Sequence, residues 1–541
     1  MNGIKLLGPL VAALASPSVL AQPALPIPQL VSKDGRHALI VDGAPFLILG
    51  AQVHNSSNYP SVLPKVWPMV EAIHANTVEI PIAWEQVEPV EGQFDFSFVQ
   101  TVLEQARSHE KRLILLWFGT WKNTGPNYTP AWVKLNNQRF PRMKTADGKD
   151  HGVLSAHGAA TLAADRAAFV GLMQFLKDRD PQHTVIVVQV ENEAGSYRNP
   201  RDHSAVANAL FAKPIPAPLA RALGKPVGSW TSTFGKQAER AFNSWYVARY
   251  INEIAAAGKA VKPLPMYVNA ALSGPDGAPD PYNAASGGPQ QDMLPVWKAA
   301  APAIDWASPD IYDKNDHNAL GYLDAYRRPD NALMVPELGN SVEHARFIYA
   351  ALGRGAIGVA PFGIDDTGYS NYPLGGLSLD PPTVAAFARP FGVFAGMSRE
   401  WAKIAFERPT WGVAKLDDGS PQTTTMGDWT ITARFDQWQF GLTEWEWLKA
   451  PPPPWAKQPI GGAVVAQLSA DTFLVTGDHV RIDVVGRAGG PANGLIVRVE
   501  EGHYERGRWI MDRVWNGDET DFGFNFVNQP VLLKVTMGHF K

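Results

Sequence analysis

Short apolar runs recur along the first two thirds of the chain and predict buried parallel strands. Each run is apolar over most of its length, as in residues 113–116, instead of alternating between apolar and polar positions. A strand that is covered on both faces requires this continuous pattern. The runs occupy residues 46–50, 77–84, 112–118, 184–190, 265–269, 306–312, 332–335 and 356–362.

Amphipathic stretches between these runs predict helices. Residues 169–176 place apolar side chains at i, i+3, i+4 and i+7, and residues 99–106 repeat the spacing. Eight strands alternating with helices over residues 37–395 favour a (β/α)8, or TIM, barrel. The alternative is an open, doubly wound sheet, which usually carries a Gly-rich phosphate-binding turn after its first strand. No such turn follows residues 46–50.

The pattern changes after about residue 396, where short strand-like runs are separated by clusters of Gly, Asp and Asn. This spacing predicts an all-β, sandwich-like C-terminal domain over residues 396–541. The expected strands are residues 430–435, 440–444, 464–468, 472–476, 480–485, 495–500 and 531–535.

The first residues have the pattern of an export signal. Lys5 precedes the apolar residues 6–15, and small or apolar residues lead to a plausible cleavage site after Ala21. We therefore expect residues 1–21 to be a signal peptide and residues 22–36 to be a leader before the folded part. The apolar stretch is too short to cross a bilayer. The expected destination is outside the cytoplasm, in the bacterial periplasm, with no membrane insertion.

Composition narrows the function classes. The formal net charge is -4 with both signs spread along the chain, which gives no indication of a nucleic-acid partner. There is no cysteine, so thiol catalysis and disulfides are excluded. The 13 His are scattered without a zinc-binding spacing, so no metal site is expected. The 18 Trp fit either sugar-stacking surfaces or a large aromatic core.

Two carboxylates follow strands that should lie on opposite sides of the barrel. Glu193 comes after the fourth expected strand and Glu337 after the seventh. The carboxyl ends of barrel strands form the active-site face. Hydrolysis of a glycoside uses two such groups, about 5–5.5 Å apart for retention of configuration and about 6.5–9.5 Å apart for inversion.

Three segments resemble glycoside hydrolase family 35, the β-galactosidases. Residues 190–197 (VENEAGSY) are similar to the acid/base motif, residues 84–96 (WEQVEPVEGQFDF) to the segment after strand two, and residues 129–133 (TPAWV) to its Pro-x-Trp-Leu stretch. The resemblance covers residues 38–395. It implies that Glu193 is the acid/base, that Glu337 is the nucleophile and that Asn192 hydrogen-bonds the sugar 2-hydroxyl. It also implies that no cofactor is needed.

The sequence departs from that family after the third strand. Residues 119–125 read GTWKNTG, without the Ala-Glu pair that helps to hold galactose. These departures resemble a bacterial branch, some of whose members look adapted to the galactose side chains of plant xyloglucan. Trp121, Asn123 and Trp132 are candidate sugar-binding residues, and the two Trp fit loop packing equally well.

The sixth strand ends close to one further candidate. Tyr312 is expected to hydrogen-bond the nucleophile, as a Tyr does in related barrels, with packing at the barrel rim as the alternative. Asp310 and Asp313 flank it and are interpreted as solvated charges on the rim.

These features favour a retaining exo-β-galactosidase that releases terminal β-D-galactosyl residues by double displacement, with xyloglucan oligosaccharides as one substrate class. A barrel glycosidase of other specificity, family 42-like or an endo-β-mannanase, is the first alternative. A non-catalytic carbohydrate-binding protein is the second. Its signature would be the loss of one carboxylate, and both are present.

Overall fold

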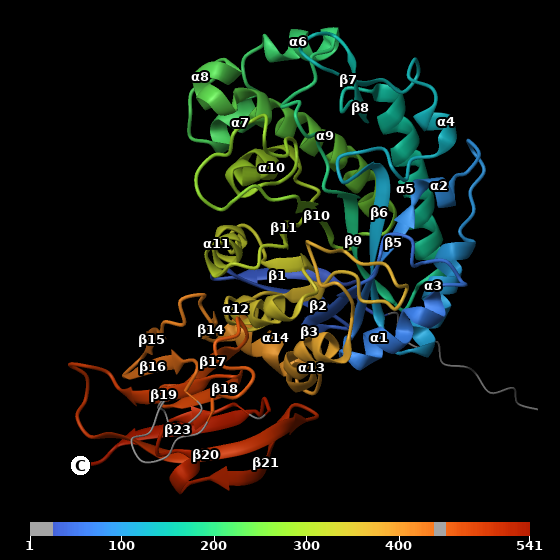
Figure 1. Cartoon of the computed structure of the whole chain (residues 1–541). Helices are drawn as coiled ribbons and strands as arrows, with labels where there is room; N and C mark the ends of the chain where they lie inside the picture. The colour runs from blue at the N-terminus through green and yellow to red at the C-terminus, as the bar shows by residue number, and fades with distance from the viewer. Residues whose placement is uncertain (1–24, 438–450, 528) are drawn as a thin grey trace, which may run out of the picture.

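The computed structural model describes residues 25–437, 451–527 and 529–541. It consists of a barrel and a C-terminal β-domain, drawn from blue to yellow and from orange to red in Figure 1. The expected signal peptide, residues 1–21, and the expected strand 440–444 lie outside the described residues. No helix within the described ranges combines the length and hydrophobicity needed to cross a membrane.

Eight parallel strands close into the expected barrel, in the order β4-β5-β6-β9-β10-β11-β12-β13 and back to β4. Every residue of these strands is buried except Arg112, which explains why the sequence shows continuous apolar runs. The strands are β4 (Ile48–Gln52), β5 (Thr77–Ala83), β6 (Arg112–Lys122), β9 (Val185–Asn192), β10 (Met266–Ala270), β11 (Trp306–Ile311), β12 (Met334–Leu338) and β13 (Gly358–Pro361).

Helices cover the outside of the barrel. In α3 (Ser97–Ser108), the four apolar residues at helical spacing are all buried, as the pattern predicts. A two-stranded sheet, β7 (Arg142–Lys144) with β8 (Asp150–Leu154), lies in the loop after β6. The other helices are α1 (Trp67–Ala72), α2 (Trp84–Val87), α4 (Ala131–Lys134), α5 (Ala159–Arg179), α6 (Ala205–Phe211), α7 (Ala217–Ala222), α8 (Trp230–Phe234), α9 (Ala238–Val261), α10 (Leu294–Ala300), α11 (Asp316–Tyr326), α12 (Arg346–Gly353), α13 (Pro381–Ala395) and α14 (Ser398–Glu407).

The expected leader is wrong over its second half. β1 (Gln29–Lys33) and β2 (Arg36–Val41) form a hairpin that continues into β3 (Ala44–Phe46). The hairpin turns at Asp34 and Gly35, both with positive φ, of 52° and 73°, a conformation that suits a tight turn. Leu39 in β2 packs in one buried cluster with interior barrel residues such as Leu116. The folded part therefore begins before residue 37.

The β-domain begins later than expected, because α13 and α14 keep the chain helical up to Glu407. Two antiparallel sheets, β14-β17-β18-β23-β20-β21 and β15-β16-β19-β22, share one apolar core and form the expected sandwich-like arrangement. Their strands are β14 (Thr410–Ala414), β15 (Gln422–Met426), β16 (Trp429–Arg434), β17 (Gly462–Ser469), β18 (Thr472–Asp478), β19 (Arg481–Gly486), β20 (Gly494–Glu505), β21 (Arg508–Trp515), β22 (Phe524–Asn525) and β23 (Leu533–His539).

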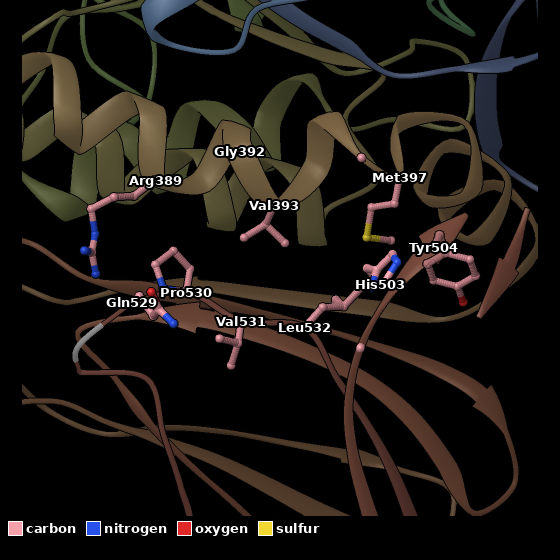
Figure 2. Close-up of a pocket in the computed structure, with 12 residues that line it drawn as sticks. Arg389, Gly392, Val393, Met397, His503, Tyr504, Gln529, Pro530, Val531 and Leu532 are labelled. Atoms are coloured by element: carbon pink, nitrogen blue, oxygen red, sulfur yellow. The ribbon is translucent and has the colours of Figure 1, made fainter. Parts of the chain in front are cut away.

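The β-domain packs against α12, α13 and α14, which lie between it and the barrel in Figure 1. Arg346 in α12 reaches across this interface and donates to the Lys415 carbonyl and to Asp417, each at 2.7 Å. A cavity of 520 Å³ lies between α13 and β20, with Val393 on the helix side toward Pro530 and Met397 above His503 (Figure 2). Its described lining residues include His503 and no carboxylate.

Candidate active site

A cavity of 480 Å³ at the carboxyl ends of the barrel strands contains both Glu193 and Glu337. We call it the carboxylate cavity. Glu193 directly follows β9, and Glu337 lies near the end of β12. The closed barrel therefore brings together two residues that are 144 positions apart in the sequence.

Hydrogen-bond donors surround the carboxylate of Glu337. Its Oε1 accepts from Gln52 Nε2 at 3.0 Å, from Asn192 Nδ2 at 3.2 Å and, at a longer 3.4 Å, from Asn269 Nδ2. Its Oε2 accepts from the Tyr312 hydroxyl at 2.7 Å. These donors match an ionised carboxylate whose direction is fixed from several strands, which is what a nucleophile requires. Tyr312 lies where the sequence analysis expected it.

Glu193 is in the opposite electrostatic situation. Burial, and next the negative charge of Glu337, raises the pKa of Glu193 to about 7, whereas the Lys122 ammonium opposes the shift. Its backbone N–H donates to Asn269 Oδ1 at 2.9 Å, which fixes the chain as it leaves β9. A carboxyl group with this pKa can act as an acid and then as a base near neutral pH.

Asn192 and Lys122 connect the two sides of the cavity. Lys122 Nζ donates to Asn192 Oδ1 at 2.9 Å and also to Asn123 Oδ1. Lys122 and Asn123 line the carboxylate cavity, but Asn192 lies behind its wall, with its amide bonded to Glu337. Asn192 is thus placed beside Glu337, and Asn123 lies where a substrate can reach it.

Asp310 is not the solvated charge on the barrel rim that the sequence suggested. It is buried in the carboxylate cavity, and its Oδ2 accepts from Asn269 Nδ2 at 2.8 Å. Burial, followed by the charges of Glu337 and Glu193, raises the pKa of Asp310 well above its ordinary value. Asp310 lines the same cavity as Glu193 and Glu337, so the site holds three neighbouring carboxyl groups instead of two.

The two tryptophans predicted as sugar platforms are packing residues. Trp121 is only 1% exposed, and its ring packs edge-on against Tyr250 with centroids 4.8 Å apart. Trp132 packs edge-on against Trp84, and its indole N–H donates to the Glu88 carbonyl at 3.1 Å. Neither ring lines the carboxylate cavity. Both contacts agree with the alternative interpretation of loop packing.

Other residues at the site were missed by the sequence analysis. Gln52 and Asn269 lie near the ends of β4 and β10, so a search of every strand end for polar residues would have found them. Tyr197 and Tyr369 line the mouth of the cavity from two loops and are 43% and 67% exposed. Their partly exposed rings suit contact with a sugar.

The fold and this pair of carboxylates define a barrel of the glycoside hydrolase type. Comparison with protein families agrees: the model of glycoside hydrolase family 42, described as "Beta-galactosidase", matches residues 61–261. A second model, a domain of unknown function (DUF5597), matches residues 387–527 and includes most of the β-domain.

Individual relatives point in the same direction. A β-galactosidase of Xanthomonas manihotis is 28% identical over 181 residues, which cover 32% of this chain and 28% of the relative. The crystal structure of a β-galactosidase from the psychrophilic Marinomonas ef1 has a TM-score of 0.50 at 12% identity, covering 67% of this chain and 62% of that one. This chain thus spans less than two thirds of both proteins, and the structural match shows the shared fold.

By these matches the barrel is similar to glycoside hydrolases of the β-galactosidase type. The resemblance to family 35 is not supported, because the family model that matches the barrel is that of family 42. The short motifs around residues 84–96 and 190–197 lie within the matched region, so they do not separate the two families.

Proposed function

We propose that this protein is a retaining, exo-acting β-galactosidase that removes terminal β-D-galactosyl residues by double displacement. The observation that carries the proposal is the contrast between the two carboxyl groups of one cavity. Glu337 accepts hydrogen bonds from four side chains, whereas burial and the charge of Glu337 raise the pKa of Glu193 to about 7. One group is suited to attack and the other to carry a proton.

The first step breaks the glycosidic bond. Glu193 gives its proton to the leaving oxygen while a carboxylate oxygen of Glu337 bonds to the anomeric carbon, and the aglycone leaves as an alcohol. Formation of the glycosyl ester neutralises Glu337, so the pKa of Glu193 falls and Glu193 remains ionised. In the second step, Glu193 takes a proton from water, the water oxygen attacks the anomeric carbon, and Glu337 leaves as a carboxylate.

The shape of the cavity supports action at chain ends. The segment between β13 and α13 supplies Phe362, Tyr369, Asn371 and Leu374 to the cavity wall. A wall on this side favours a pocket for one terminal sugar over an open groove for an internal one, and so argues against an endo-mannanase. We further propose galactosylated xyloglucan oligosaccharides as substrates, with Tyr197 and Tyr369 in contact with the aglycone, and export to the periplasm directed by residues 1–21.

The test is a panel of 4-nitrophenyl β-glycosides together with a galactosylated xyloglucan oligosaccharide. We expect cleavage of the β-galactoside, and NMR should detect the β-anomer of galactose first. Glu337→Gln should lower kcat by at least about 10³-fold, because the nucleophile is lost. Glu91→Gln, at an exposed carboxylate paired with Arg139, is the matched control and should keep full activity.

Other outcomes would change the proposal in different ways. Release of α-galactose first would contradict retention. Preference for another sugar would favour the alternative of a family 42-like barrel with different specificity. Unchanged activity of Glu337→Gln would mean that another carboxylate, with Asp310 the nearest choice, is the nucleophile.

A further inference from the structure

The register between β6 and β9 breaks immediately before the candidate site. Trp117 pairs with Val190, and the next pair is Lys122 with Asn192. The chain advances five residues on β6 but only two on β9, so β6 bulges between Trp117 and Lys122. Bulges beside active sites re-aim side chains, and this one delivers Lys122 to Asn192.

Glu191 closes the bulge from the side of β9. Its Oε1 accepts from the Thr120 backbone N–H at 3.1 Å, and its Oε2 accepts from the Trp121 N–H at 2.7 Å. Glu191 has φ of 63°, a left-handed conformation that is uncommon for a residue other than glycine. Glu191 is fully buried and lies outside the carboxylate cavity, so it has no direct role in the chemistry.

A second buried carboxylate, Asp165 in α5, completes the arrangement. Asp165 accepts from the Trp117 indole at 2.9 Å, from the Thr120 N–H at 3.0 Å and from the Thr120 hydroxyl at 2.6 Å. Burial, and next the charge of Asp165, raises the pKa of Glu191 well above its ordinary value, and two carboxyl groups this close do not both ionise. Because three donors point at Asp165, the charge resides there and the shared proton resides on Glu191.

The side chains around Glu191 and Asp165 are tightly packed. A Cβ added to Gly119 would lie 2.5 Å from Trp117 Nε1, 2.6 Å from Glu191 Oε1 and 2.8 Å from Asp165 Oδ1. Only glycine fits at this position without displacing the indole or one of the carboxyl groups. The arrangement therefore has little freedom to adopt a second geometry.

We propose that Glu191 and Asp165 are positioning residues that share one proton and hold the β6 bulge, and through it Lys122, Asn192 and Glu193, in catalytic register. The route is contiguous. The pair fixes the bulge, the bulge places Lys122 on Asn192, and Asn192 donates to Glu337. Glu193 follows two residues after Glu191, so the contacts that hold Glu191 also fix the backbone from which the side chain of the proposed acid/base extends. The inference rests on the proposed glycosidase function.

The shared proton determines which substitutions are tolerated. Glu191→Gln keeps an acceptor for the Trp121 N–H and a donor for Asp165, and the Thr120 N–H retains Asp165 as its acceptor. Glu191→Leu provides neither donor nor acceptor. Asp165→Asn replaces one of the two acceptor oxygens that face the Trp117 indole, the Thr120 N–H and the Thr120 hydroxyl by an NH2 donor, and so disturbs the pair without changing its volume.

The experiment compares kcat and KM of these full-length variants on two galactosides, one with a dinitrophenyl and one with an alkyl leaving group. We expect Glu191→Gln to stay within about threefold of the parent. For Glu191→Leu, a displacement of about 1 Å should lower kcat on the alkyl galactoside by about 100-fold. The loss on the dinitrophenyl galactoside should be at least tenfold smaller, because that leaving group needs no acid. KM should change little, and Asp165→Asn should reproduce this pattern if Glu191→Leu does not fold.

A purely structural role makes a different prediction. It would lower Tm and the fraction of active enzyme while the kcat of each titrated active site stayed the same with both leaving groups. That result, or equal losses in Glu191→Gln and Glu191→Leu, would overturn the proposal. The measurement uses whichever glycoside the parent enzyme cleaves, so a failure of the galactosidase assignment is seen in the parent enzyme and remains distinct from a failure of the positioning role.

Discussion

The Tyr312 hydroxyl donates a hydrogen bond of 2.7 Å to Oε2 of Glu337. Burial, and next the charge of Glu337, raises the pKa of Tyr312 well above its ordinary value, so the phenol remains protonated and keeps donating at any working pH. The other three donors to Glu337 all contact Oε1. Tyr312 alone therefore orients the second oxygen among the contacts described.

Removal of this hydroxyl should impair catalysis more than folding. A hydrogen bond to a charged group contributes about 1.5–3 kcal/mol, so Tyr312→Phe should lower kcat/KM by about 10–150-fold. Steady-state kinetics on an aryl galactoside measures the effect, and Tm should change little. Tyr246→Phe, at a half-buried Tyr that packs against Phe242 and does not line the carboxylate cavity, is the control and should behave as the parent. A loss below twofold in Tyr312→Phe would exclude a role in orienting the nucleophile.

The pH profile should report the proton of Glu193. The first step needs the protonated acid, and the pKa of Glu193 is raised to about 7. kcat/KM should therefore fall about tenfold per pH unit above neutrality. Glu193→Gln should remove this alkaline limb on a dinitrophenyl galactoside, and azide should accelerate the second step by replacing the base-activated water. A profile that stays flat from pH 6 to 9 would contradict the assignment of the acid.

The same shift has a consequence for stability. The ordinary pKa of 4.5 applies to Glu193 in the unfolded chain, and about 7 applies in the folded protein. Between these values the folded state holds a proton that the unfolded state has lost, so this contribution to stability falls as pH rises through that window. Glu193→Gln should then raise Tm by a few degrees at pH 8 and leave it unchanged at pH 4.5. Calorimetry at the two pH values is the test, and an equal gain at both would refute a charge effect.

Because Trp121 is buried, its substitution should lower stability, whereas substitution of a sugar platform would weaken substrate binding. The Trp121 ring packs in the core against Tyr250, so Trp121→Leu should lower Tm through a cavity that costs about 3 kcal/mol. KM of the remaining folded enzyme should stay within twofold of the parent. Tyr197→Ala, at the cavity mouth, should do the reverse and raise KM for an oligosaccharide without changing Tm. Thermal melts and kinetics on both variants separate packing from binding.

The fold was largely predictable because the barrel strands are buried on both faces. Their sequences are apolar over most of their length, so all eight could be located without a partner structure. The hairpin of β1 and β2 was not recognised, since its start is rich in Pro and Gln and its packing partners, such as Leu116, are distant in sequence. α14 was assigned to the β-domain for the same reason: nothing local to Ser398–Glu407 marks where the barrel ends.

Only those site residues that lie at the ends of strands could be predicted from the sequence. Glu193, Glu337 and Tyr312 each follow or close a strand, and a local pattern is enough to place them. Asp310 was misread because burial depends on surrounding elements and not on its neighbours in sequence. Lys122 was missed because β6 bulges before it, so that strand alternation does not predict where its side chain points.

The effect of the Lys122 charge on the pKa of Glu193 can be tested by one substitution. This charge lowers the pKa of Glu193, against burial and the charge of Glu337, which both raise it. Lys122→Met removes that charge, so the pKa of Glu193 should rise and the alkaline limb of kcat/KM should move to higher pH. The maximal rate should also fall by about tenfold, the loss expected for one hydrogen bond to a charged group, since Asn192 loses its partner. Lys134→Met, at a lysine paired with Glu85 outside the cavity, should change neither quantity. A limb that moves to lower pH in Lys122→Met would show that Lys122 does not oppose the raised pKa of Glu193.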